Sequence, residues 1–121
     1  MQNHSSVTLN HGNYSYNLEK AVSPALREKG LGDRKNLAKG KGMLFVFETP
    51  EKVCFWMKDM KFSIDIIWLD AQKRVTHIEQ AVSPSTYPQS YCPDQPAKYV
   101  IELNTGEAAR SGIHTGQTLS F

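Results

Sequence analysis

Three side chains that can hold a ligand stand close together in the sequence. Trp56 and Lys58 are two positions apart, and Asp65 interrupts an apolar run that continues to Trp68. If neighbouring strands carry them, Lys58 and Asp65 meet at the rim of an apolar pocket, where the lysine holds an anionic or polar group. A tryptophan face suits a sugar ring or another amphipathic ligand. This pattern predicts a binding site for a polar ligand.

Strand parity decides which of these side chains lie together. Successive side chains on a strand point to opposite faces, so Trp56 and Lys58 share one face while Met57 takes the other. Asp65 is then the expected partner of Lys58. The alternative is a structural ion pair that fixes the register of two strands and meets no ligand. The sequence leaves both interpretations open.

Glu102 and Arg34 are further candidates for the same site. We expect the Glu102 carboxylate to contact Arg34 or Lys58, either tying the basic segment to the sheet or binding the ligand. Asp65 and Glu102 also form a possible general acid–base pair, which would indicate a small hydrolase. No Gly-x-Ser-x-Gly motif is present, and we assign no catalytic residue.

Sulfur and imidazole groups are present but scattered. Some have the ligand chemistry of a soft-metal site such as copper(I): Met43, Met57, Met60, His77, His114 and Cys54. The spacing of Met57 and Met60 does not place both on one strand face, and methionine also fills cores. No His-x-x-x-His, Cys-x-x-Cys or acidic calcium loop occurs. We therefore expect neither a metal nor another cofactor.

The elements that must position these residues are mostly short strands. Alternating polar and apolar residues predict a half-buried strand beginning at Tyr14. Four prolines make 83–96 a long loop. Further strands are expected at 43–47, 53–57, 62–69, 74–81, 99–103 and 117–121, the first two of these forming a hairpin.

Two short helices complete the prediction. Ser23 and Pro24 have the residue types of a helix start, and Gly30 ends that helix, while 106–111 predicts one more helical turn. Many short strands with one or two short helices are typical of a mainly β domain, a β-sandwich or jelly-roll-like fold, or a partly closed barrel. The 121 residues fit one domain. We place it at 14–121, with the polar segment 1–13 as a flexible linker.

Charge and hydropathy exclude some partners. The net charge of +2 is too small to indicate nucleic acid, and we expect the basic residues between Arg27 and Lys41 to be solvated. No apolar run approaches the roughly 18 residues of a membrane-spanning helix, and 1–13 lacks the apolar region of a signal peptide. We expect a monomer that reaches a membrane only through an anchor outside this sequence.

Cys54 and Cys92 are the two cysteines of the chain. They are compatible with one disulfide, which would close a loop of about 38 residues and stabilise the fold by roughly 4 kcal/mol in the chain-entropy model. The alternative is two independent thiols, with Cys54 buried and Cys92 exposed.

Several linked motifs resemble one bacterial and archaeal family. The segments GMLFVF (42–47), FWMK (55–58), IDII (64–67) and YVIELNTG (99–106) are similar to the family called domain of unknown function 192. REKGL (27–31) with Arg34 resembles its Arg-x-x-Gly-Leu-x-x-Arg opening, and 112–117 its closing Gly-Ile and Gly-Asp pairs. The resemblance runs from about Tyr16 to Phe121. Departures are Gln117 for an acidic residue, Thr105 for alanine, and Asp59-Met60 for Asn-Thr.

This resemblance implies a β-sandwich or jelly-roll-like fold and, because members are often exported, an extracytoplasmic location. The protein would be periplasmic, secreted or membrane-anchored, with its targeting segment outside this sequence. The resemblance implies no activity. Our first hypothesis is therefore a non-enzymatic binding or accessory module for a saccharide or cell-envelope component. The residues assigned to that site are Trp56, Lys58, Asp65, Arg34 and Glu102. The alternatives are the small hydrolase and a structural or protein-interaction domain with no pocket.

Overall fold

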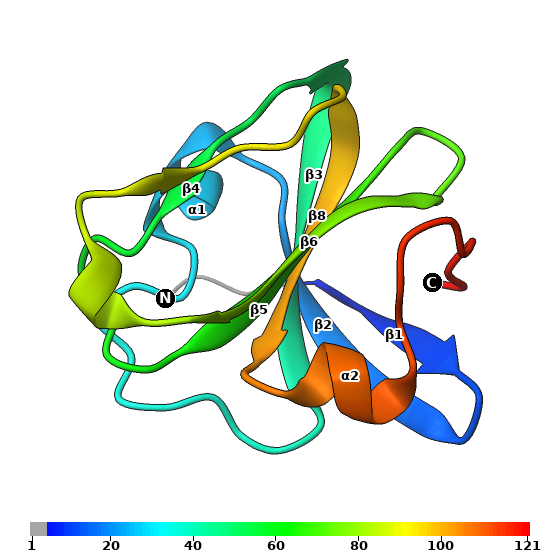
Figure 1. The fold of residues 1–121 in the computed structure, drawn as a ribbon, viewed down its shortest axis with the longest axis horizontal. Coiled ribbons are helices and arrows are strands. Elements are labelled where there is room, and N and C mark those ends of the chain that lie inside the picture. Colours follow the sequence, from blue (N-terminus) through cyan, green and yellow to red (C-terminus); the bar gives the residue numbers. More distant parts are fainter. Residues whose placement is uncertain (1–4) are drawn as a thin grey trace.

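The computed structural model describes residues 5–121, and its centre is a six-stranded mixed sheet (Figure 1). Across the sheet the strands are ordered β1-β2-β3-β8-β5-β6, and a separate small sheet pairs β4 with β7. The strands are β1 (Ser6–His11), β2 (Tyr14–Ala21), β3 (Lys41–Glu51), β4 (Phe55–Trp56), β5 (Ile64–Leu69), β6 (Val75–Val82), β7 (Ser90–Tyr91) and β8 (Ala97–Asn104). The prediction of a mainly β domain with two short helices is confirmed, and the sheet does not close into a barrel.

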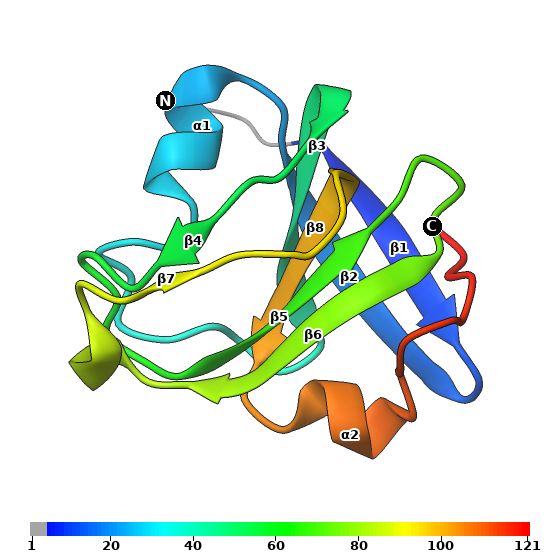
Figure 2. The ribbon, with the colours of Figure 1, turned by 45° about the horizontal axis from the view of Figure 1, so that its top comes forward.

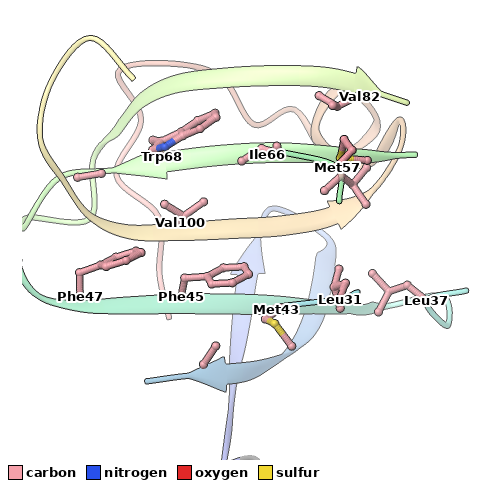
Figure 3. Packing of buried hydrophobic residues seen from close by; sticks show 13 residues of the cluster. Leu31, Leu37, Met43, Phe45, Phe47, Met57, Ile66, Trp68, Val82 and Val100 are labelled. Carbon is pink, nitrogen blue, oxygen red and sulfur yellow. The ribbon is translucent and has the colours of Figure 1, made fainter. Parts of the chain in front are cut away.

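Both faces of the large sheet bury an apolar cluster. Phe45, Ile66 and Val100 point into the first, which we call the α1-side core (Figure 3). Their sequence neighbours Leu44, Ile67 and Ile101 point to the other face, into the α2-side core. All six residues of β5 are buried, as expected of a central strand covered on both faces.

The two helices lie on opposite sides of the large sheet (Figures 1 and 2). The Ser23 hydroxyl accepts a hydrogen bond from the Leu26 backbone N–H at 3.1 Å and begins α1 (Pro24–Lys29), which ends at Gly30 with a positive φ of 50°. Helix α2 (Glu107–Ser111) ends at Gly112. Both helices confirm the sequence prediction. The long loop contains a single 3₁₀ turn at Pro84–Thr86 together with β7.

The predicted hairpin between 43–47 and 53–57 is wrong. Strand β3 pairs in parallel with β2 and antiparallel with β8, and β4 pairs only with β7. A strand that is apolar on both faces is typical of the interior of a covered sheet, and β3 lies there between β2 and β8. The predicted strand at 117–121 is reduced to isolated bridges, such as Ser120 with Asn10.

Strand β1 lies within the segment predicted as a linker. It pairs with β2 along its whole length, from Ser6 opposite Glu19 to His11 opposite Tyr14. Leu9 is completely buried in the α2-side core. The alternation of Val7 and Leu9 with polar residues is the strand signal, and the low apolar content of the segment concealed it. Residues 1–4 of the predicted linker lie outside the described residues.

Gly42 stands where three strands approach closely. A Cβ atom there would lie 2.7 Å from the Glu102 carbonyl oxygen, 2.7 Å from Leu103 Cδ2 and 2.8 Å from Leu18 Cδ2. No side chain fits this space, so glycine is required for β3 to lie between β2 and β8. This packing fixes the position of Glu102 on β8.

Candidate functional site

A pocket of about 560 Å³ lies between α1, the loop that follows it, and the segment around β4. The large sheet contributes Phe45, Phe47 and Glu102 to its lining, and the walls come from segments 25–33 and 53–60. The volume is in the range of small-molecule sites, which are mostly apolar with a few polar groups.

The α1 wall is fixed to the sheet by specific contacts. The Arg27 guanidinium donates hydrogen bonds to the backbone carbonyls of Val22 at 2.6 Å and Val46 at 3.0 Å, and it lies 5.0 Å from the centre of the Phe47 ring. At Gly30 a Cβ atom would come within 3.2 Å of Phe45 Cζ. The turn after α1 therefore lies directly on an aromatic ring of the pocket.

Glu102 presents a buried carboxyl group to this pocket. Its neighbours on β8, Ile101 and Leu103, face the α2-side core, so Glu102 faces the opposite side. Its exposed fraction is 5%, and its side chain makes no hydrogen bond or ion pair with any described residue. Its carboxyl oxygens are therefore open to the pocket, because no fully buried side-chain oxygen among the described residues lacks a partner. Burial raises the pKa of Glu102 from 4.5 to about 8. The carboxyl is therefore mostly protonated at neutral pH, and it is free to donate a hydrogen bond or, once ionised, to bind a cation.

Trp56 and Lys58 form the exposed rim of the pocket. Trp56 has an exposed fraction of 49%, and the Lys58 ammonium lies 5.8 Å from the centre of its ring. Met57 is buried in the α1-side core, so the predicted division of faces is found. The ring of Tyr87 lies 5.2 Å from that of Trp56 and extends the aromatic surface.

Asp65 is not at this site, and the expected ion pair with Lys58 does not form. The Asp65 side chain is completely buried. It accepts hydrogen bonds from the backbone N–H groups of Ala81 at 2.9 Å and Ala108 at 3.0 Å. Ala108 lies in the first turn of α2, whose N-cap residue, Gly106, has no capping side chain. Asp65 supplies that missing acceptor.

The acid–base pair of Asp65 and Glu102 is also absent. Asp65 contacts α2 and Glu102 lines the pocket on the α1 side, so their carboxyl groups point to opposite faces of the sheet. They cannot share a water molecule, and the hydrolase hypothesis loses its catalytic pair. Period-two alternation separates them because β5 and β8 pair Ile66, not Asp65, with Glu102.

Arg34 lies outside the pocket lining and does not contact Glu102. Its guanidinium makes two hydrogen bonds to the carboxylate of Glu19, at 3.1 and 2.8 Å. This pair ties the loop after α1 to β2 and raises the pKa of Arg34. A bidentate partner on the nearest strand satisfies the arginine, so the expected contact with Glu102 does not arise.

The residues considered for a soft-metal site are dispersed. Met43 and Met57 pack in the α1-side core, His77 pairs with Glu79 at 2.8 Å, and Cys54 is bonded to another cysteine. Among residues 5–121, no three His, Cys, Asp or Glu side chains are grouped so that they could hold a metal ion.

Cys54 and Cys92 form the predicted disulfide. Cys54 precedes β4 and lines the pocket, and Cys92 follows β7. The bond therefore joins the two chain segments that build the small sheet, which has only two residues in each strand.

Replacing both cysteines with serine is expected to lower the free energy of unfolding by about 2–4 kcal/mol, because the closed loop of 38 residues restricts the unfolded chain. Urea titrations with and without reductant measure the effect. Reductant must destabilise the wild-type protein and leave the Cys54→Ser/Cys92→Ser variant unchanged. Equal stability of the oxidised wild type and the double variant would contradict this expectation.

Several residues of the pocket escape sequence reasoning. Phe45 and Phe55, whose ring centres lie 5.0 Å apart, read only as core residues in their apolar runs. The wall segment 27–33 coincides with the REKGL motif, and that motif is the one signal that could have located it.

None of the described helices is long and apolar enough to cross a membrane.

Comparisons with known proteins find relatives of the same fold. The model of the DUF192 family, described as Uncharacterized ACR, matches residues 7–121. The structure is similar to that of a candidate transcription regulator from Sinorhizobium meliloti 1021, with 28% identity, a TM-score of 0.90, and coverage of 99% of this chain and 96% of that chain. It is also similar to a protein of unknown function from Novosphingobium aromaticivorans DSM 12444, with 29% identity, a TM-score of 0.85, and coverage of 98% and 85%. A comparison with curated proteins finds no match.

Proposed function

This chain belongs to the DUF192 family, and we propose that it is a non-enzymatic binding module for a polar ligand, a saccharide or another component of the cell envelope. The observation that carries this proposal is the Glu102 carboxyl, which faces the pocket without a partner among the described residues. Its carboxyl oxygens are open to the pocket, and a carboxyl that is poorly solvated and has no hydrogen-bond partner is costly. A ligand group that reaches Glu102 would remove that cost.

The rim supports a ligand with a flat, partly apolar surface. Trp56 and Tyr87 are both about half exposed, at 49% and 46%, although large aromatic side chains are usually more buried. Their rings lie together, and Lys58 adds a cation beside them. A sugar ring stacks on such a surface while its hydroxyl groups reach polar side chains.

The relative named as a candidate transcription regulator raises DNA binding as another function. A recognition helix presents several turns to the major groove. Helices α1 and α2 have six and five residues, and the net charge is +2. These features favour a module that binds a small ligand over a DNA-binding protein.

The disulfide supports an extracytoplasmic location. Disulfides persist in oxidising compartments and are rare in the reducing cytosol. The Cys54–Cys92 bond holds a wall of the pocket, so an oxidising compartment keeps the site intact. We propose a monomer in such a compartment, held at a membrane only if an anchor outside this sequence is attached.

The proposal is tested by titrating saccharides and cell-envelope fragments into ¹⁵N-labelled protein and following amide chemical shifts. Ligand binding is expected to shift the resonances of Gly30, Phe55 and Glu102. Trp56→Ala should weaken binding about tenfold, a stacking contribution of roughly 1.4 kcal/mol.

Val22→Ala is the matched control, because Val22 has the same exposed fraction as Trp56 but does not line the pocket. It should leave the affinity unchanged. A screen in which no ligand shifts the pocket resonances would refute the binding function and favour a structural or interaction domain.

A further inference from the structure

We propose that the ligand carries an organic cation, an ammonium or guanidinium group, and that Glu102 is the counterion that binds it inside the pocket. This inference rests on the proposed binding function, because it concerns the same pocket. It adds the chemical class of the group that enters deepest.

The charges that line the pocket leave Glu102 without an internal partner. Besides Glu102 the lining contains three cationic and three anionic side chains, whose formal charges cancel: Arg27, Lys29, Lys58, Glu28, Asp33 and Asp59. None of these three cations pairs with Glu102. Arg27 is bonded to two backbone carbonyls, Lys29 lies 3.5 Å from Asp33, and Lys58 lies against Trp56. Ionised Glu102 thus has no cationic partner among the residues that line the pocket.

Burial alone accounts for the raised pKa of Glu102. Desolvation raises its pKa to about 8, and no neighbouring cation opposes the effect. A carboxyl in this state is stabilised in its charged form by any cation that enters. A neutral ligand instead finds one hydrogen-bond donor and no charge.

The aromatic lining favours a cation over a neutral polar group. Phe45, Phe47 and Phe55 line the same pocket as Glu102, and aromatic ring faces attract ammonium and guanidinium groups. The fold already contains one such contact at the pocket wall, where the Arg27 guanidinium lies 5.0 Å from the centre of the Phe47 ring. Aromatic rings together with a carboxylate are the chemistry that recognises an organic cation.

Binding of a cation must release a proton. The protonated carboxyl of Glu102 loses its proton to solvent and the cation takes its place, so one positive charge leaves the site as another enters. With a pKa near 8 in the free protein, the affinity for a cation of constant charge should rise roughly 100-fold between pH 6 and pH 9.

The experiment uses choline, whose quaternary ammonium keeps its charge, and its neutral isostere 3,3-dimethyl-1-butanol. Isothermal titration calorimetry at pH 6, 7 and 9 gives the affinities. Measurements at pH 7 in two buffers of different ionisation enthalpy count the protons released. Choline is expected to bind more tightly as pH rises and to release most of one proton at pH 7, while the neutral isostere shows neither effect.

Glu102→Gln and Glu28→Gln form the matched pair of variants. Both remove a carboxyl group from the pocket lining, but Glu28 is exposed on α1 and Glu102 is buried. Glu102→Gln should abolish the pH dependence and the proton release, and Glu28→Gln should retain both. Circular dichroism checks that each variant is folded.

Two results would overturn the inference. Equal binding of choline and the neutral isostere, with affinity falling above pH 8, would show that Glu102 acts as a neutral hydrogen-bond donor. Binding of uncharged saccharides in the pocket without binding of choline would support the proposed binding function and refute the inference that the ligand carries a cation. If neither kind of ligand binds, the proposed function fails as well.

Discussion

Replacing Asp65 with alanine is expected to lower the free energy of unfolding by about 3–5 kcal/mol. The Asp65 carboxylate is completely buried and accepts hydrogen bonds from the backbone N–H groups of Ala81 and Ala108. Alanine leaves both donors without a partner, at about 1–3 kcal/mol each, and leaves a cavity at the start of α2. Urea titration followed by circular dichroism measures the change.

Asp65→Asn and Asp94→Ala are the informative comparisons. Asparagine keeps the shape of the side chain but has one oxygen acceptor. We therefore expect Asp65→Asn to lower the free energy of unfolding by about half as much as Asp65→Ala. Asp94 is exposed, and its replacement with alanine should change stability by less than about 0.5 kcal/mol. If Asp65→Ala is as mild as Asp94→Ala, Asp65 does not hold α2 against the sheet.

Glu102→Gln is expected to make the protein more stable than the wild type at alkaline pH. The pKa of Glu102 is about 8 in the folded protein, whereas the ordinary value of 4.5 applies to the unfolded chain. The folded state therefore holds the proton of Glu102 more tightly than the unfolded chain does. Stability linked to Glu102 is therefore complete below pH 4.5 and is lost as the pH rises to 8. The loss is on the order of 5 kcal/mol at pH 9.

The measurement is the free energy of unfolding of both proteins from pH 4 to pH 9. Because all other titrating groups are shared, the difference between wild type and Glu102→Gln isolates this carboxyl. Glu28→Gln provides a control at an exposed position on the pocket wall, and it should follow the wild-type curve. Parallel curves for wild type and Glu102→Gln would mean that water solvates Glu102 in the pocket.

Local features of this fold follow from the sequence because their causes are local. The Ser23–Pro24 start and Gly30 end of α1 depend on residues within one helix, and the structure contains both. The opposite orientation of Trp56 and Met57 depends only on strand alternation. For Cys54 and Cys92, the two cysteines of the chain, the sequence left a disulfide and two independent thiols open, and the structure contains the disulfide.

The partners of strands and charges were not predictable, because they depend on contacts distant in sequence. The apolar run of β3 shows that both faces are covered, but not that β2 and β8 are its neighbours. Asp65 and Lys58 have complementary charges, yet the backbone donor of Ala108, 43 positions away, decides where the carboxylate binds. The pocket likewise requires α1 to fold back over Phe45, a contact that no local pattern specifies.

The central place of β8 has a consequence for how the chain folds. Strands β3 and β5 are not hydrogen-bonded to each other, and β8 lies between them, with Val100 opposite both Phe45 and Trp68. During synthesis these two strands therefore emerge with apolar side chains and open edges, well before their shared partner exists. For β3 the pairing with β8 closes a loop of more than 50 residues, which is slow compared with local pairing. Unpaired strand edges promote aggregation. Until the last quarter of the chain arrives, neither core can close, so a nascent chain of this fold needs protection that the finished protein does not.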